Sequence, residues 1–252
     1  MADRAILFSA PMVRALLHGR KTQTRRQFSS ARVFATVERP AYTLRGEDMQ
    51  RALQGASGFR NLGGDNWVWA CDAYEWQAPI ERTEVLAHIG YGIGDRLWVR
   101  EAWRTHKAYD DLKPCEMSGE EAVWPELDRD NCDALGRYRH ARFMPRWASR
   151  LTLTVTDVRI QRLQDCSEAD AQAEGVELES ADPPFYYVPG IWPHSLTGVG
   201  VEEPGGRHAV CSYAKLWDHI NGSGAWEKNP WVVAVTFDVL KGNIDNLPQV
   251  AA

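Results

Sequence analysis

One stretch in the second half of the chain constrains the fold more than any other feature. Residues 151–155 (LTLTV) alternate between apolar and polar side chains, and the alternation changes phase at Thr156 and Asp157 before it resumes at Val158 and Ile160. Strict alternation is typical of a β-strand with one buried face, and a change of phase is what a β-bulge produces. Because bulges bend sheets, this segment predicts a long strand in a small barrel.

Other segments fit the same architecture. Residues 229–240 (NPWVVAVTFDVL) form a near-continuous apolar run, which predicts a strand buried on both faces. Residues 5–9 and 92–104 predict further strands, the latter with Leu97, Val99 and Glu101 on one face. Helices are expected over 12–19, 167–175 and 213–222, where glycines 19, 175 and 222 supply the C-terminal ends. The expectation is an α+β fold, a small mixed β-barrel with peripheral helices.

The 252 residues are long enough to bury a large core, and we expect a single domain over residues 1–252. Three stretches lack the periodicity of the rest and are expected to be insertions: about 27–93, 105–140 and 178–208. Loops of such length in compact domains are usually functional or disordered. The third insertion is expected to form part of the rim of a binding pocket.

Composition favours a cytoplasmic protein. The five cysteines, at positions 71, 115, 132, 166 and 211, form no CxxC pair, which indicates reduced thiols and neither a metal site nor a cofactor. The first residues lack the pattern of a signal peptide, and no apolar run is long enough to cross a bilayer, so no membrane partner is expected. The oligomeric state stays open.

Charge and aromatic content bear on the partner. A net charge of −5 argues against a protein that coats long nucleic acid, because phosphate binding normally needs an excess of Lys and Arg. Eleven tryptophans nevertheless supply flat apolar surfaces, on which a base can stack or which can fill the core.

The segment GRKTQTRR at residues 19–26 places four cations and two hydroxyls in eight positions just after a predicted helix. On one interpretation these cations are solvated on a turn and complement the helix dipole. On the other, like-charge repulsion from three arginines lowers the proton affinity of Lys21, so that it can act as a base. Thr24 would then be the nucleophile that this base activates.

A leaving amine also needs a proton donor, and the sequence offers two carboxylates. Glu101 lies in the predicted strand, and Glu174 lies on the last turn of the predicted short helix, where position alone suggests an exposed residue. If Thr24 and Glu174 are catalytic, both should be exposed in a cleft. The motifs of serine hydrolases, zinc proteases and nucleotide-phosphate binders are missing from the sequence.

Four blocks of the chain resemble, in order, the bacterial and phage ASCH-domain family. They are ILFSAPMVRALLHGRKTQTRR, GDRLWVREAWR, MPRWASRLTLTVTDVRIQRL and NPWVVAVTF, within residues 6–237. The resemblance implies a β-barrel related to PUA domains, with a cleft for RNA or a modified base. Some small members of the family are N4-acetylcytidine amidohydrolases.

The catalytic motifs of those small enzymes have counterparts here. Residues 19–24 (GRKTQT) match the pattern G-x-K-T-x-T, and residues 167–174 (SEADAQAE) match T/S-E-x-x-A-x-x-E. The resemblance therefore implies that Lys21, Thr24 and Glu174 are catalytic. This chain is much longer than those enzymes and richer in tryptophan.

Two functions follow as expectations. In the first, the chain cleaves the N4-acyl amide of a modified cytidine nucleoside: Lys21 assists attack by Thr24, Glu174 protonates the amine, and the Ser9 N–H or Arg25 stabilises the oxyanion. In the second, the same cleft only binds RNA or a modified base, and the basic turn holds the flanking phosphates. The residues expected to bind substrate are Ser9, Arg25, Trp98, Arg100, Glu101 and Trp231.

Overall fold

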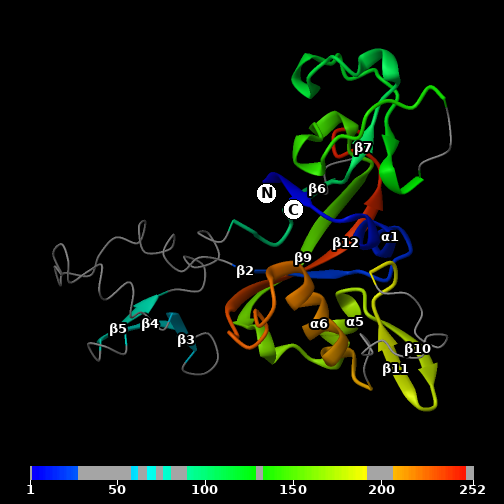
Figure 1. The fold of residues 1–252 in the computed structure, drawn as a ribbon. Helices are drawn as coiled ribbons and strands as arrows, with labels where there is room; N and C mark the ends of the chain where they lie inside the picture. The colour runs from blue at the N-terminus through cyan, green and yellow to red at the C-terminus, as the bar shows by residue number, and fades with distance from the viewer. Residues whose placement is uncertain are drawn as a thin grey trace.

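The centre of the fold is a five-stranded sheet. The computed structural model describes residues 2–27, 58–61, 67–71, 76–80, 90–128, 133–191 and 207–247. The sheet has the strand order β1-β6-β9-β12-β2, in which β1 and β6 are parallel and all other neighbours are antiparallel (Figure 1). These strands are β1 (Asp3–Leu7), β2 (Gln23–Gln27), β6 (Arg96–Arg100), β9 (Leu151–Arg162) and β12 (Trp231–Lys241).

The longest pairing in the sheet, between β9 and β12, contains the predicted bulge. Asp157 lies opposite Thr236, but the next pair is Val155 with Phe237, so Thr156 is the extra residue on β9. The prediction from the phase change is therefore confirmed. The bulge lets both halves of β9 bury their apolar side chains on the same face, since Val155 and Val158 belong to one core cluster.

That core lies against one face of the sheet and is closed by helix α1 (Ala10–Leu17). The predicted face of β6 is confirmed, because Leu97 and Val99 are core residues. The buried members of this cluster are Ile6, Phe8, Val13, Leu16, Leu97, Val99, Leu151, Leu153, Val155, Val158, Val233, Val235 and Phe237.

A second core lies on the other face of β12, against α5 (Glu168–Ala173) and α6 (Ala209–Asn221). Val232 of β12 belongs to this second cluster and Val233 to the first, which confirms that β12 is buried on both faces. A capping box begins α5: the Ser167 hydroxyl accepts from the Asp170 N–H, and the Asp170 carboxylate accepts from the Ser167 N–H.

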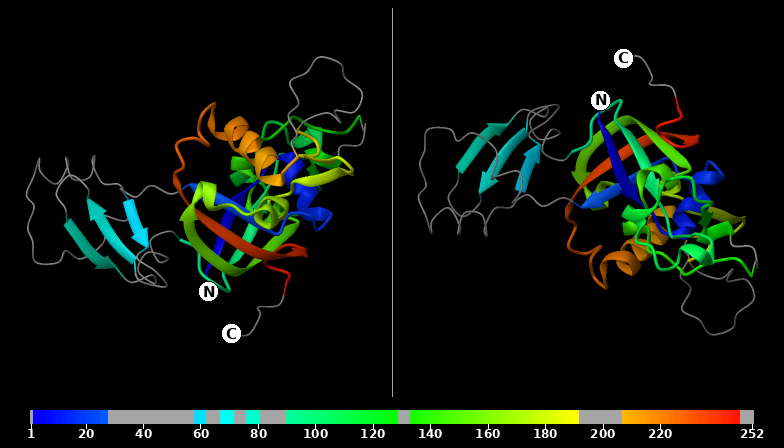
Figure 2. Two further views of the ribbon diagram at one scale, coloured as in Figure 1. Left: turned by 90° about the horizontal axis from the view of Figure 1, so that it is seen from below. Right: turned by 90° about the horizontal axis from the view of Figure 1, so that it is seen from above.

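The sheet has two edges, so its hydrogen bonds do not close a barrel within the described residues. The edges are β1 and β2. The sheet is strongly curved (Figure 2), and a side chain joins its edges: Arg26 of β2 donates to the Leu7 carbonyl at 2.7 Å, and its guanidinium lies over the Phe8 ring at 5.2 Å. The α+β class is confirmed, and the PUA-like barrel stays a prediction.

The three expected insertions differ in what the structure describes of them. The first contains a three-stranded antiparallel sheet of β3 (Gly58–Asn61), β4 (Trp67–Cys71) and β5 (Trp76–Ile80), and its other residues from 28 to 89 lie outside the described part. The third contains the hairpin of β10 (Glu177–Ala181) and β11 (Pro184–Tyr187), and residues 192–206 lie outside the described part. The predicted role of the third insertion as a pocket rim stays a prediction.

The second insertion is built from short elements that pack around Trp103. Strand β7 (Trp103–Arg104) pairs with β8 (Trp124–Pro125), and Trp103 packs with Met144 and Ala148. The single-turn 3-10 helices here and near β9 are η2 (Lys107–Tyr109), η3 (Pro114–Glu116), η4 (Glu126–Asp128), η5 (Ala141–Phe143), η6 (Arg146–Ala148) and η7 (Leu163–Asp165). In the described part of the chain, no helix has the length and apolar character that a membrane crossing requires.

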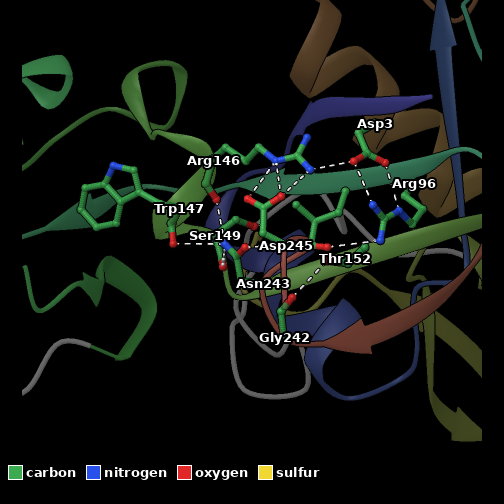
Figure 3. Close-up of polar contacts among 10 residues, drawn as sticks. Asp3, Arg96, Arg146, Trp147, Ser149, Thr152, Gly242, Asn243 and Asp245 are labelled. Carbon is green, nitrogen blue, oxygen red and sulfur yellow. Dashed lines mark hydrogen bonds and ion pairs between the residues drawn. The ribbon is translucent and has the colours of Figure 1, made fainter. Parts of the chain in front are cut away.

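A polar network joins the start of β1 and the segment after β12 to the segment before β9 (Figure 3). Arg146 donates to Asp3 at 2.6 Å and to Asp245 at 2.6 Å, and Arg96 binds Asp3 from β6. The Asn243 amide donates to the carbonyls of residues 146, 147 and 149 at 2.8 to 3.1 Å. These contacts hold β1 and the end of β12 in place.

Candidate functional site

The cation-rich segment of residues 19–26 leads from the end of α1 directly into the edge strand β2. Gly19 has a φ of +71°, and the N–H groups of Arg20 and Lys21 both donate to the Ala15 carbonyl. The prediction of a turn after Gly19 is therefore confirmed, but the turn is shorter than expected because residues 23–27 form β2. The Thr22 N–H donates to the Ala173 carbonyl at 2.9 Å, which places this turn beside the end of α5.

Lys21 and Glu174 form a buried pair, which is the centre of the site. The Lys21 ammonium donates to Glu174 Oε2 at 2.6 Å and to the Glu174 backbone carbonyl at 2.9 Å. The Lys21 side chain is 0% exposed and that of Glu174 is 4% exposed. The interpretation of Lys21 as a solvated cation is therefore wrong, as is that of Glu174 as an exposed helix residue. We call these two residues the buried pair.

The second oxygen of Glu174 is held from two other elements. Arg25 Nη1 donates to Glu174 Oε1 at 3.3 Å, and the Tyr213 hydroxyl of α6 lies 3.4 Å from the same oxygen. Arg25 also donates to Gln23 Oε1 at 2.6 Å, and its guanidinium lies 5.7 Å from the centre of the Tyr213 ring. Both carboxylate oxygens of Glu174 therefore have hydrogen-bond donors.

Arg25 is in turn bound by a second carboxylate. Arg25 Nη2 lies 3.1 Å from Asp170 Oδ2, and Arg159 of β9 donates to Asp170 Oδ1 at 2.7 Å. Asp170 is thus shared between a buried and a partly exposed arginine. The sequence does not predict Asp170, Arg159 or Tyr213 as site residues, because nothing in the linear sequence places them beside Glu174.

Burial dominates the protonation of these groups. It lowers the pKa of Lys21 below its ordinary value; Glu174 opposes this shift, while Arg26 and Arg25 add to it. Burial, and then the Glu174 charge, raise the pKa of Tyr213. Burial raises the pKa of the Cys166 thiol to about 12, so it stays protonated. The lowered proton affinity expected for Lys21 is thus present, with burial as its main cause.

Thr24 lies on the face of β2 opposite to Arg25. Across the antiparallel pairing Thr24 is opposite Val235, and Arg25 is opposite Ala234, and residues paired in this way share a face of the sheet. Val235 belongs to the core that includes Phe8. Thr24 therefore points to that core's side of the sheet, whereas Arg25 points toward α5 and α6.

Lys21 does not contact the Thr24 hydroxyl in this structure. Within the described residues the Thr24 hydroxyl has no hydrogen-bond partner, and the Lys21 ammonium donates to Glu174. Thr24 is 4% exposed, so it is not open in a cleft as expected, and neither is Glu174. Both residues are packed against the sheet. The Lys21 ammonium lies 5.8 Å from the centre of the Phe8 ring, and the Arg26 guanidinium lies 5.2 Å from the same ring centre.

The alternative proton donor Glu101 belongs to a different ion pair. It is buried and accepts from Arg150 Nε at 2.8 Å and Nη2 at 3.1 Å. Arg100 stacks on Trp98, with 4.4 Å from the guanidinium to the ring centre, and donates to the Arg142 carbonyl. Trp98, Arg100 and Glu101 therefore contact groups outside the buried pair.

The remaining predicted residues lie at element ends. Ser9 is exposed and is the N-cap of α1, although its side chain makes no capping bond. Trp231 begins β12, and the Arg162 guanidinium lies 4.5 Å from its ring centre. In the described part of the chain, no three His, Cys, Asp or Glu side chains are grouped so that they could hold a metal ion.

Replacing Asp170 by asparagine is expected to reduce the loss of stability in acid. Burial alone would raise the pKa of Asp170, but hydrogen bonds from Arg159 and Ser167 and the charge of Arg25 together lower the pKa below its ordinary value of 3.8. A carboxylate with a lowered pKa stabilises the fold above about pH 4, and this contribution is lost as the pH falls toward the folded-state pKa.

Urea unfolding between pH 5 and pH 2 measures this difference. We expect the wild-type free energy of unfolding to fall more steeply below about pH 4 than that of the Asp170→Asn variant, which should be less stable at neutral pH by about 1–3 kcal/mol. Parallel pH dependences for the two proteins would contradict the assignment.

Comparison with known proteins adds no family to these observations. The likeness to ASCH domains rests on the sequence blocks described above, and the site rests on its own geometry. No protein-family model, no curated protein and no solved structure matches this chain.

Proposed function

We propose that this protein is an ASCH-type amidohydrolase that cleaves the N4-acyl amide of modified cytidine nucleosides. The observation that carries the proposal is the 2.6 Å hydrogen bond between Lys21 and Glu174 in a fully buried setting. It joins residues 153 positions apart that the sequence motifs had assigned separately as base and acid.

A single proton transfer within the buried pair supplies both the base and the acid that the reaction needs. Moving a single proton from the Lys21 ammonium to the Glu174 carboxylate turns the ion pair into a neutral amine and a neutral acid. Burial favours this form, because it penalises both charges, whereas Arg25 and Tyr213 favour the carboxylate. In the neutral form the Lys21 amine is the base and the Glu174 carboxyl is the acid.

Amide hydrolysis would then proceed through an ester of Thr24. The Thr24 hydroxyl oxygen bonds to the acyl carbon, and its proton passes to the neutral amine of Lys21. The bond from that carbon to N4 breaks as the protonated Glu174 gives its proton to N4, which releases cytidine. Water then attacks the ester carbon, giving the carboxylic acid and regenerating Thr24.

The position of Thr24 fits a nucleophile that the fold leaves unpaired. β2 is an edge of the sheet, and the other edge comes near it where Arg26 donates to the Leu7 carbonyl. We place the substrate at this edge, beside Thr24 and the Phe8 ring, where its entry requires the packing that buries Thr24 to open. Arg25 contacts Glu174, Gln23 and Asp170 from the face of β2 opposite to Thr24, so in this proposal it supports the acid and does not bind the oxyanion.

Replacing Lys21 by arginine is expected to reduce turnover of N4-acetylcytidine at least about a hundredfold, the lower end of what a positioned base contributes. A guanidinium keeps the positive charge opposite Glu174 but does not deprotonate in proteins. The measurement is release of cytidine, followed by chromatography, beside the affinity for a non-hydrolysable cytidine analogue.

The same pair of measurements separates catalysis from simple binding. Loss of turnover with retained affinity supports the role of Lys21 as a base. Wild-type turnover in the Lys21→Arg protein contradicts that role, and thermal unfolding of the variant checks that it is folded. Binding of the analogue with no turnover in the wild type would instead identify a module that only binds modified bases or RNA.

A further inference from the structure

Five charged side chains of alternating sign form a continuous series of ion pairs from the interior to the surface. Lys21 binds Glu174 at 2.6 Å, Glu174 binds Arg25 at 3.3 Å, Arg25 lies 3.1 Å from Asp170, and Asp170 binds Arg159 at 2.7 Å. The first three side chains are at most 4% exposed, Asp170 is 13% exposed and Arg159 is 39% exposed. The buried end of this series of ion pairs is the proposed catalytic pair, Lys21 and Glu174.

Arg25 is the middle member of this series and is held by two carboxylates. Its guanidinium is bound on one side by Glu174 and on the other by Asp170, and both carboxylates come from the α5 segment. Lys21 and Arg25 share Glu174, whose single negative charge offsets only one of their two positive charges and so leaves an excess positive charge in a buried setting. The Asp170 charge offsets it, and Arg159 at the surface offsets Asp170 in turn.

We infer that Asp170 is a positioning residue that holds Arg25 against Glu174 and tunes the charge state of the buried pair, with Arg159 opposing it from the surface. The consequence for catalysis rests on the proposed function, whereas the electrostatic coupling can be measured without it. Neither Asp170 nor Arg159 touches the proposed reacting atoms. Their effect is transmitted by charge.

The other titratable and charged groups near the buried pair do not obscure the electrostatic coupling of this pair to Asp170 and Arg159. Tyr213 of α6 and Cys166 before α5 are buried and stay protonated near neutral pH, because burial raises the pKa of each. Arg26 of β2 adds a constant positive charge. Glu168 of α5 is half exposed, accepts from the Ala209 N–H at 2.6 Å and lies near His208, which is largely exposed.

Charge removal at the two positions should shift protonation in opposite directions. Asp170→Asn removes a negative charge, so Lys21 should lose its proton at lower pH. Arg159→Gln removes a positive charge, so Lys21 should lose its proton at higher pH. We expect each shift to be about half a pH unit or more. The readout is the titration of the Lys21 side chain by NMR of 13Cε-labelled lysine, with both limbs of the pH–rate profile beside it.

Two further variants separate charge from structure. Ser167→Ala removes the cap of α5, whose hydroxyl accepts from the Asp170 N–H at 3.1 Å, but it leaves the Asp170 charge in place. Asp157→Asn removes the other carboxylate near Arg159, at 3.3 Å, where both side chains are exposed. Neither variant should move the Lys21 titration by more than a small fraction of the Asp170→Asn shift.

The outcomes distinguish this inference from the proposed function. Opposite shifts for Asp170→Asn and Arg159→Gln support the inference, even if the wild type releases no cytidine, in which case only the proposed function fails. Unmoved titrations, or shifts in the same direction, overturn the inference even if turnover is found. Because Arg159 is partly exposed, Arg159→Gln provides the test if Asp170→Asn does not fold.

Discussion

Replacing Thr24 by valine is expected to reduce hydrolysis of N4-acetylcytidine at least about a thousandfold, since removal of a hydrolase nucleophile leaves only binding and electrostatic effects. Valine keeps the branched shape of threonine and loses only the hydroxyl. Because that hydroxyl has no hydrogen-bond partner among the described residues, the free energy of unfolding should change by less than about 1 kcal/mol. Release of cytidine and urea unfolding measure the two effects.

Two matched variants control this result. Thr24→Ser retains a hydroxyl at the same position and should keep measurable turnover. Thr22→Val changes the same residue type two positions earlier, where the side chain is exposed, and should leave turnover unchanged. Near wild-type activity in Thr24→Val would exclude Thr24 as the nucleophile.

Replacing Glu174 by alanine is expected to lower the free energy of unfolding by about 3–5 kcal/mol, the usual cost of leaving the partner of a buried ion pair uncompensated. Among the described residues, the Lys21 ammonium of this variant keeps only the backbone carbonyl of residue 174 as its acceptor, and Arg25 keeps only Asp170 as a carboxylate partner. Urea unfolding near neutral pH, with the transition followed by tryptophan fluorescence, gives the value.

Loss of activity in Glu174→Ala must therefore be read together with its stability. Glu174→Gln keeps the size of the side chain and its acceptor oxygen, so it is the better variant for turnover. Glu120→Ala removes an exposed glutamate and should change the free energy of unfolding by less than about 0.5 kcal/mol. If Glu174→Ala costs no more than Glu120→Ala, the buried pair does not stabilise the fold.

Four of the five strands of the central sheet, β1, β6, β9 and β12, are predicted because each carries its own signal, whereas the cation-rich residues of β2 predict a turn. Alternation in residues 151–155 and the phase change at Thr156 predict both β9 and its bulge. The apolar run of residues 231–235 predicts a strand between two cores. Closure could not be predicted in this way, because it depends on whether the edges β1 and β2 pair, and neither strand encodes its neighbours.

The candidate site is less visible in the sequence, because its parts come from distant segments. The motifs indicated Lys21 and Glu174 separately, and only the fold shows that they share a hydrogen bond. The burial of Lys21 could not be anticipated, because residues 19–26 are rich in cations. Asp170 and Tyr213 carry no local signal of catalysis, since a capping residue and a helix tyrosine have ordinary structural uses.

Incubation of the wild-type protein with N4-acetylcytidine, with both products quantified, tests the central claim most directly. The proposal predicts that cytidine and acetate appear in equal amounts, that their rate scales with protein concentration, and that both are lost in Thr24→Val. Intact N4-acetylcytidine after prolonged incubation with folded protein, under conditions in which a non-hydrolysable cytidine analogue saturates its site, would contradict the proposal.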